Sequence, residues 1–223
     1  MRLTFTIPFR VRLKPARLAL ALLPAALLLV VPAARAQFGA PPTTQVHDAS
    51  ALKPPAGAKV AIVEFEDLEC PDCARANPLL KEAAAKYNIP WVRHDFPLPM
   101  HNWSFQAAVN ARYFDTKSQA LGNEYRDSVF ASQISIETPD QLRQFTQKFA
   151  DAHKVVLPWA VDPMGKLTQA VKADFALGQK IGIEHTPTIW VVTNAAHTAP
   201  FVEVVDRSKL YQIIDEALAE TRR

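Results

Sequence analysis

The chain of 223 residues contains only two cysteines, Cys70 and Cys73, and they are separated by Pro71 and Asp72. A disulfide between them would constrain the unfolded chain little, because stabilisation by a disulfide grows with the length of the loop that it closes. A structural zinc site usually takes four cysteine or histidine ligands, and the sequence offers no second cysteine pair. We therefore interpret the pair as a redox dithiol, with a copper site of two cysteines and one histidine as the alternative.

The segments around the dithiol predict how it is positioned. A β-branched and apolar run at 59–65 predicts a buried strand, and residues 91–96 predict a second strand. Between them, residues 74–87 are rich in Ala, Leu and Lys and predict a helix that begins near Pro71, a residue tolerated in a first helical turn. Pro78 lies inside this helix and predicts a kink. The dithiol is thus expected at the start of the helix in a βαβ unit.

A helix start suits disulfide exchange, because its free N–H groups and dipole stabilise the thiolate that acts as nucleophile. Cys70, just outside the first turn, is expected to be the exposed attacking sulfur. Cys73, one turn further on, is expected to be shielded and to resolve the mixed disulfide.

The basic residues of the chain are concentrated at its N-terminus. Residues 1–36 contain six Lys and Arg and no acid, and an apolar run at 18–31 is followed by Ala34-Arg35-Ala36. This pattern is typical of a cleaved signal peptide, so we predict that the mature chain begins near Gln37. An uncleaved membrane anchor is the alternative, although the run is short for the roughly 20 apolar residues that a bilayer requires.

Removal of residues 1–36 changes the sign of the net charge. The precursor carries +3, and the remainder has 19 basic and 22 acidic residues, a net charge of −3. We therefore expect no nucleic-acid partner, because binding to a polyanion needs a retained basic surface. The expected location is the periplasm or the outside of the cell, where disulfides persist.

The longer pattern resembles DsbA-like thiol:disulfide interchange proteins of the thioredoxin-fold superfamily. The resemblance rests on Glu64 six residues before the first cysteine, the segment 96–101, the pair Thr186-Pro187 before an apolar run, and a strand-helix ending at 201–218. It implies an α/β thioredoxin fold, βαβ…ββα around a mixed sheet, with an inserted all-helical domain.

The same resemblance implies roles for particular residues. Glu64 would be a buried acid that moves protons to and from Cys73. Pro187 would be cis, would pack beside Cys70 and would block metal capture by the dithiol. The backbone of Thr186 would hydrogen-bond to an extended substrate peptide. Pro71 and Asp72 would belong to the active-site loop.

The predicted organisation has five parts. Helical segments are expected at 103–118, 122–131, 139–153 and 163–180. The parts are a signal peptide at 1–36, an extended Pro- and Ala-rich lead-in at 37–58, the first half of the thioredoxin fold at 59–101, the helical insertion at 102–180 and the second half of the fold at 181–223.

Acidic residues crowd the active-site segment. Asp72 lies between the cysteines, no basic residue is adjacent in the segment, and four more acids precede it: Glu64, Glu66, Asp67 and Glu69. Like charge disfavours a thiolate, so we expect a higher pKa for Cys70 than a histidine in place of Asp72 would give. We predict a weaker oxidant than the strongly oxidising members of the family.

The predicted function is an exported thiol:disulfide oxidoreductase that acts on proteins with thiols or disulfides and needs no cofactor beyond its own Cys70–Cys73 disulfide. The alternatives are a periplasmic reductase dedicated to one client, for example in cytochrome maturation, and a metal-binding module. A dithiol reacts in both directions, and the resemblance implies that a membrane partner, a quinone-linked oxidase or a thiol reductase, recharges it. We expect a monomer, because residues 37–58 are too few for a dimerisation domain.

Overall fold

The structure is a computed structural model that describes residues 43–196 and 198–222. The predicted signal peptide, its cleavage point and the first part of the lead-in lie outside these residues. Within the described ranges, no helix is both long and apolar enough to cross a membrane.

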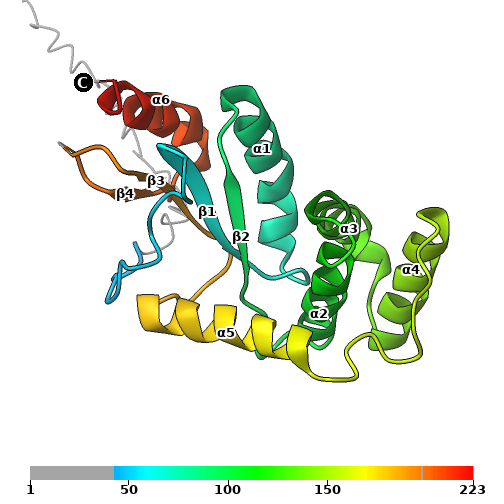
Figure 1. Ribbon diagram of the computed structural model, residues 1–223. Helices are drawn as coiled ribbons and strands as arrows, with labels where there is room; N and C mark the ends of the chain where they lie inside the picture. Colours follow the sequence, from blue (N-terminus) through cyan, green and yellow to red (C-terminus); the bar gives the residue numbers. More distant parts are fainter. Residues whose placement is uncertain (1–42, 197, 223) are drawn as a thin grey trace, which may run out of the picture. The chain divides into compact units, whose positions relative to one another are not determined.

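A four-stranded mixed sheet forms the centre of the fold (Figure 1). Its strands are β1 (Val60–Glu66), β2 (Trp91–Asp95), β3 (Thr188–Thr193) and β4 (Phe201–Glu203). The order across the sheet is β2-β1-β3-β4, with β1 parallel to β2 and antiparallel to β3, and β3 antiparallel to β4. The central strand β1 is buried along its whole length, so a polar side chain on it must find its partners inside the protein.

The described residues contain six α-helices and two short 3-10 turns. They are α1 (Pro71–Tyr87), α2 (Ser104–Asp115), α3 (Gln119–Ser132), α4 (Pro139–Ala152), α5 (Lys166–Ile181), α6 (Leu210–Glu220), η1 (Gln133–Ser135) and η2 (Arg207–Lys209). Each predicted helix is present, with ends that differ by a few residues. Helix α1 continues through Pro78, and helix α4 begins with the expected cap, because the Thr138 side chain accepts from the Gln141 N–H.

The two faces of the sheet are covered by different helices. Val60 and Ile62 of β1 pack in one cluster with residues of α1 and α6, whereas Ala61 and Val63 pack in another with residues of α5. Figure 1 shows α1 and α6 on one side of the sheet and α5 on the other. This alternation is what a strand buried on both faces requires, because successive side chains point in opposite directions.

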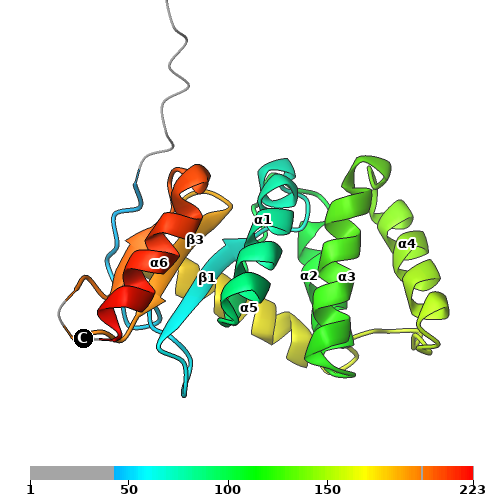
Figure 2. The same cartoon turned by 90° about the horizontal axis from the view of Figure 1, so that it is seen from above.

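Helices α2, α3 and α4 lie within the predicted insertion at 102–180 and stand side by side (Figure 2). Aromatic side chains fill the space between them, with Phe114 packed 4.7 Å from Tyr125 and 4.9 Å from Phe149, measured between ring centroids. The same cluster includes Cys70 and Cys73. The insertion therefore forms one wall around the dithiol.

The described part of the lead-in packs against the domain. The Thr44 N–H donates to the Glu203 carboxylate at 2.7 Å, and the His47 N–H donates to the Ile181 carbonyl at 2.8 Å. Leu52 is buried. Gly182 follows α5 with φ 105°, and a Cβ at this position would lie 2.5 Å from the Gln45 carbonyl oxygen. Glycine thus permits both the turn and the close approach of the lead-in.

Candidate functional site

The two cysteines occupy the first turn of α1, as the sequence predicts. Cys70 is the N-cap residue with φ −77° and ψ 120°, Pro71 opens the helix, and Cys73 lies one turn further on. Both are free thiols. Cys73 is completely buried and Cys70 is 7% exposed. The expectation of an exposed Cys70 is therefore wrong, because the loop before β3 covers it: the Cys70 thiol donates to the Thr186 carbonyl at 3.3 Å.

The two sulfurs differ in acidity. A hydrogen bond from Cys73 is the largest of the effects that lower the pKa of Cys70 from 9.0 to about 6; burial opposes the shift, and the backbone N–H groups of Cys73 and Asp72 add to it. Burial raises the pKa of Cys73 well above 9.0, and the charges of Cys70 and Glu64 raise it further. One sulfur of the pair is thus prepared as a thiolate while the other keeps its proton.

The loop before β3 brings a third element to the cysteines. The Thr186–Pro187 peptide bond is cis, as the resemblance implies. Thr186 is buried, and the Thr188 hydroxyl donates to the His185 carbonyl at 2.7 Å, which ties the loop to the start of β3. A hollow of about 90 Å³ is lined by residues of this loop, of α1 and of the β4 end, among them Asp72, His185, Pro187 and Arg207.

Glu64 lies on β1, opposite Arg93 of β2 and Ile189 of β3 in the register, and is 1% exposed. Its Oε2 accepts from the indole Nε1 of Trp91 at 2.9 Å, and its Oε1 has no hydrogen-bond partner among the described residues. Burial raises the pKa of Glu64 well above 4.5, and the neighbouring Glu66 adds to the shift. A carboxyl group in this state has a high affinity for a proton.

Trp91 was not singled out by the sequence analysis. A tryptophan inside a predicted strand is a usable signal, because a buried indole N–H nearly always finds an acceptor. The sequence alone does not say which acceptor.

Two acids of the active-site segment, Glu66 and Asp72, form ion pairs with arginines that are not adjacent to them in the sequence. Glu66 contacts Arg93 at 2.8 Å and Arg126 at 3.6 Å. Asp72 contacts Arg75 at 3.0 Å and Arg207 at 2.7 Å. All of these arginines except Arg75 come from distant parts of the chain, which is why the local sequence did not reveal them.

Two further acids of the segment, Asp67 and Glu69, bind groups between the end of β2 and the start of α2. Asp67 accepts from the Leu98 N–H at 2.6 Å and from the Ser104 hydroxyl, and it lies 2.7 Å from Nδ1 of His101. Glu69 accepts from the N–H groups of Trp103 and Ser104 at 2.7 and 2.9 Å. These bonds hold the turn between β1 and α1 in place.

Gln133 of η1 reaches the same turn from the far end of α3. Its side-chain amide donates to the carbonyls of Leu68 and Cys70 at 2.9 and 3.1 Å. A single side chain of the insertion thereby fixes the backbone on both sides of Glu69.

Comparison with known proteins identifies this arrangement. The sequence profile of the family described as Thioredoxin matches residues 55–207, more than half of the chain. The chain belongs to the thioredoxin family. No curated protein sequence matches it.

Solved structures with the same fold are DsbA-like. Wolbachia pipientis alpha-DsbA1 is 17% identical with a TM-score of 0.60, and the match covers 76% of this chain and 92% of that one. Proteus mirabilis ScsC in a transitional conformation is 20% identical with a TM-score of 0.57, covering 75% and 71%. A periplasmic thioredoxin-like protein from Salmonella enterica serovar Typhimurium is 20% identical with a TM-score of 0.56, covering 74% and 87%. The chain therefore has a DsbA-like thioredoxin fold with a helical insertion, as predicted.

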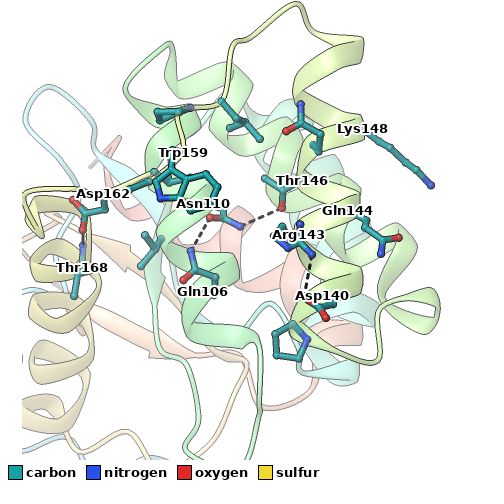
Figure 3. A pocket seen from close by; sticks show the side chains of 17 residues that line it. Gln106, Asn110, Asp140, Arg143, Gln144, Thr146, Lys148, Trp159, Asp162 and Thr168 are labelled. Atoms are coloured by element: carbon teal, nitrogen blue, oxygen red, sulfur yellow. Dashed lines mark hydrogen bonds and ion pairs between the residues drawn. The ribbon is translucent and has the colours of Figure 1, made fainter.

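The insertion of this thioredoxin-family chain also contains a cavity of about 1110 Å³ between α2, α4 and the segment 157–162 (Figure 3). Gln106, Asn110 and Thr146 form a chain of hydrogen bonds along its wall, with distances of 2.9 and 3.1 Å. Neither cysteine lines this cavity. We therefore place the candidate site at the dithiol.

No group of three or more His, Cys, Asp or Glu side chains within residues 43–196 and 198–222 is arranged to hold a metal ion.

Proposed function

We propose that the protein is an exported thiol:disulfide oxidoreductase that exchanges disulfides with cysteine-containing proteins through Cys70 and Cys73. The observation that carries this proposal is the position of the two cysteines at the start of α1, where Cys70 is the N-cap residue and Cys73 is buried one turn further on. The lowered pKa of Cys70 and the raised pKa of Cys73 agree with this position. A nucleophilic thiolate beside a protonated second thiol is what exchange through a mixed disulfide requires.

In the reducing direction, the Cys70 thiolate attacks one sulfur of a substrate disulfide. A Cys70–substrate disulfide forms, and the other substrate sulfur leaves as a thiolate that takes up a proton. Cys73 then loses its proton and attacks the Cys70 sulfur, which forms the Cys70–Cys73 disulfide and releases the second substrate thiol. Two electrons pass to the substrate, and the oxidising direction is the reverse.

We assign Glu64 as the group that takes the Cys73 proton and returns it in the reverse reaction. The support is electrostatic: Glu64 is among the groups whose charge raises the pKa of Cys73, and its Oε1 has no partner in the described part of the chain. The raised pKa of Glu64 increases its affinity for that proton.

We assign substrate binding to the surface formed by Thr186, Pro187, Pro71 and Asp72. The Thr186 carbonyl already accepts a hydrogen bond from Cys70, and an extended substrate segment would meet the loop backbone as a strand does. The hollow beside Pro187 gives room for one substrate side chain.

We place the protein in the periplasm or outside the cell, as a monomer recharged by a membrane redox partner. The N-terminal sequence pattern and the likeness to a periplasmic thioredoxin-like protein support this location. The domain limits follow from the same proposal: a signal peptide at 1–36, a lead-in at 37–58, fold halves at 59–101 and 181–223, and an insertion at 102–180.

Two variants test the proposal. Cys70→Ser is expected to abolish reduction of insulin disulfides, because no attacking sulfur remains. Cys73→Ser is expected to accumulate mixed disulfides in the native compartment, because the attack on Cys70 is lost. Melting temperatures of the reduced forms show whether both variants are folded. Exchange by Cys70→Ser, or no trapped disulfide with Cys73→Ser, contradicts the proposal.

The same experiment separates the alternatives. Many trapped proteins favour a general oxidoreductase, and a single trapped protein favours a reductase dedicated to one client. Stoichiometric copper or zinc in the purified reduced protein, together with no insulin reduction, favours a metal-binding module.

A further inference from the structure

Arg207 lies 135 residues after the active-site loop in the sequence and contacts it directly. It belongs to η2, the turn that follows β4. Its Nη2 donates to the Asp72 carboxylate at 2.7 Å, and its Nη1 donates to the Asp72 main-chain carbonyl at 3.2 Å. The planar guanidinium thus holds Asp72 by its side chain and by its backbone.

Arg75 contacts the same aspartate in a different way. It lies three residues further along α1, and its Nη2 reaches the Asp72 carboxylate at 3.0 Å. The Arg75 side chain is 66% exposed, against 33% for Arg207. Arg75 therefore contributes a charge that solvent screens, whereas Arg207 contributes a charge and a hydrogen bond to the main chain.

The backbone contact lies on the peptide unit between Asp72 and Cys73, in the first turn of α1. The Asp72 carbonyl and the Cys73 N–H belong to one peptide group. Cys70 is the N-cap residue of the same turn, and the Cys73 main chain is among the groups that lower its pKa. A donor bound to the carbonyl orients this peptide and strengthens the donor at its other end, because hydrogen bonds in series polarise one another.

We propose that Arg207 is a positioning residue for disulfide exchange: it orients the Asp72–Cys73 peptide in the first turn of α1, next to Cys70, and it neutralises the Asp72 carboxylate. The proposal deepens the proposed function, on which it rests, and the reaction steps remain those given above. Arg207 acts through Asp72 and Cys73.

Other charged groups lie in this region and contribute to its electrostatic potential. Asp72, Cys73 and Arg75 come from α1, and Cys70 is its N-cap residue. His185 comes from the loop before β3 and lines the same hollow as Arg207. Glu203 of β4 also lines it, and its carboxylate is bound by Thr44. Glu64 raises the pKa of Cys73.

The experiment measures the pKa of Cys70 in the reduced full-length protein from the pH dependence of its alkylation by iodoacetamide. For Arg207→Ala we expect a rise of about 0.5, since partly exposed ion pairs are weak and one pKa unit is a tenfold change. The alkylation rate at pH 5 then falls about threefold. Arg207→Lys, which keeps the charge, is expected to lie between Arg207→Ala and the wild type.

Two single variants are matched controls. Arg75→Ala removes the other arginine on the same carboxylate, and it should raise the pKa of Cys70 by less than Arg207→Ala does. Arg143→Ala removes an exposed arginine that pairs with Asp140 in the helical insertion. It should leave the pKa of Cys70 unchanged.

A double-mutant cycle with Asp72→Asn separates charge from position. The asparagine has no carboxylate charge but keeps the main-chain carbonyl, so part of the Arg207→Ala effect should persist in that background. An effect that disappears there and equals that of Arg75→Ala overturns the positioning role. An unchanged pKa of Cys70 in a folded Arg207→Ala protein overturns the whole inference.

The outcome is independent of substrate exchange, because alkylation needs only the Cys70 thiolate. If the wild type fails to reduce insulin, the proposed function fails while the effect on Cys70 is still measured. If the wild type reduces insulin and Arg207→Ala alkylates like the wild type, the inference fails and the proposed function stands.

Discussion

Two buried carboxylates on β1, Glu64 and Glu66, differ in the groups that bind them. Glu64 and Glu66 are two residues apart, point to the same face and are each 1% exposed. Glu66 meets Arg93 at 2.8 Å and Arg126 at 3.6 Å. Glu64 has the Trp91 indole at 2.9 Å and one oxygen without a partner among the described residues.

The difference separates a carboxylate that is held in a network of ion pairs from one that has no cationic hydrogen-bond partner in the part of the chain that the structure describes. Buried charges that are matched by arginines contribute a fixed network, and such networks are costly to break. A buried carboxylate with a single neutral donor holds its proton more tightly and can exchange it. Because both acids are equally buried, the position of the arginines distinguishes them, and Glu64 is the one that we propose for proton transfer to the dithiol.

The largest expected effect comes from breaking the Glu66 network. Arg126 is buried and also binds Asp115 through two bonds of 2.8 Å. Arg126→Met should lower the free energy of unfolding by about 3–5 kcal/mol, because it removes a buried cation that Glu66 and Asp115 share. Urea denaturation measures this loss, and the exposed Arg143→Met serves as the control. A loss below about 1 kcal/mol would show that the network is dispensable.

The second effect concerns pH. Because the pKa of Glu64 is raised in the folded protein, its contribution to stability is complete below its unfolded value near 4.5 and is lost as the pH rises toward the folded value. The slope is up to about 1.4 kcal/mol per pH unit. Glu64→Gln removes this contribution, so the stability of the wild type relative to this variant should fall as the pH rises. Urea titrations of both reduced proteins from pH 4 to 8 test this, and parallel curves would contradict it.

The third effect is kinetic. Glu64→Gln should slow the attack of Cys73 on the mixed disulfide by about tenfold at neutral pH. This is less than the roughly 100-fold that a positioned acid or base commonly supplies, because water can also take the proton. Rapid-quench measurement of the decay of a mixed disulfide with glutathione gives the rate. An unchanged rate and pH profile would remove Glu64 from the mechanism.

The smallest effect concerns the indole that binds Glu64. Trp91→Phe keeps an aromatic ring and removes the hydrogen bond to Oε2. The pKa of Glu64 should rise further, since that bond favours the charged form, and the resolution step should slow by about two- to threefold. A pH profile identical to that of the wild type would show that the indole only fills space.

The order of the helices and strands could be predicted because it depends on short stretches of sequence. The apolar run of β1, Pro71 at the helix start and the Thr138-Pro139 cap each depend on neighbouring residues. The pairing of the acids could not, because Arg93, Arg126 and Arg207 reach them only after the chain has folded. The weaker-oxidant prediction therefore loses its stated premise, the absence of a base near the acids, and it stays a prediction. Equilibration with glutathione measures the potential directly.

The exposure of Cys70 was misjudged for the same reason. The residue that covers it, Thr186, is 116 positions away. The resemblance to DsbA-like proteins did place Thr186 and Pro187 beside the dithiol, because a family pattern carries long-range information that a single segment lacks. Trp91 and Gln133 were missed, since each acts through one hydrogen-bonding group whose acceptors lie far along the chain.

The bond of Gln133 to the carbonyls of Leu68 and Cys70 has a practical consequence. Any change of the active-site backbone between the dithiol and disulfide states alters the electronic environment of this one side-chain amide. Its two amide protons form a built-in reporter at the tip of α3. The nuclear magnetic resonance signals of these two protons would thus report the redox state of the protein without modification of either sulfur.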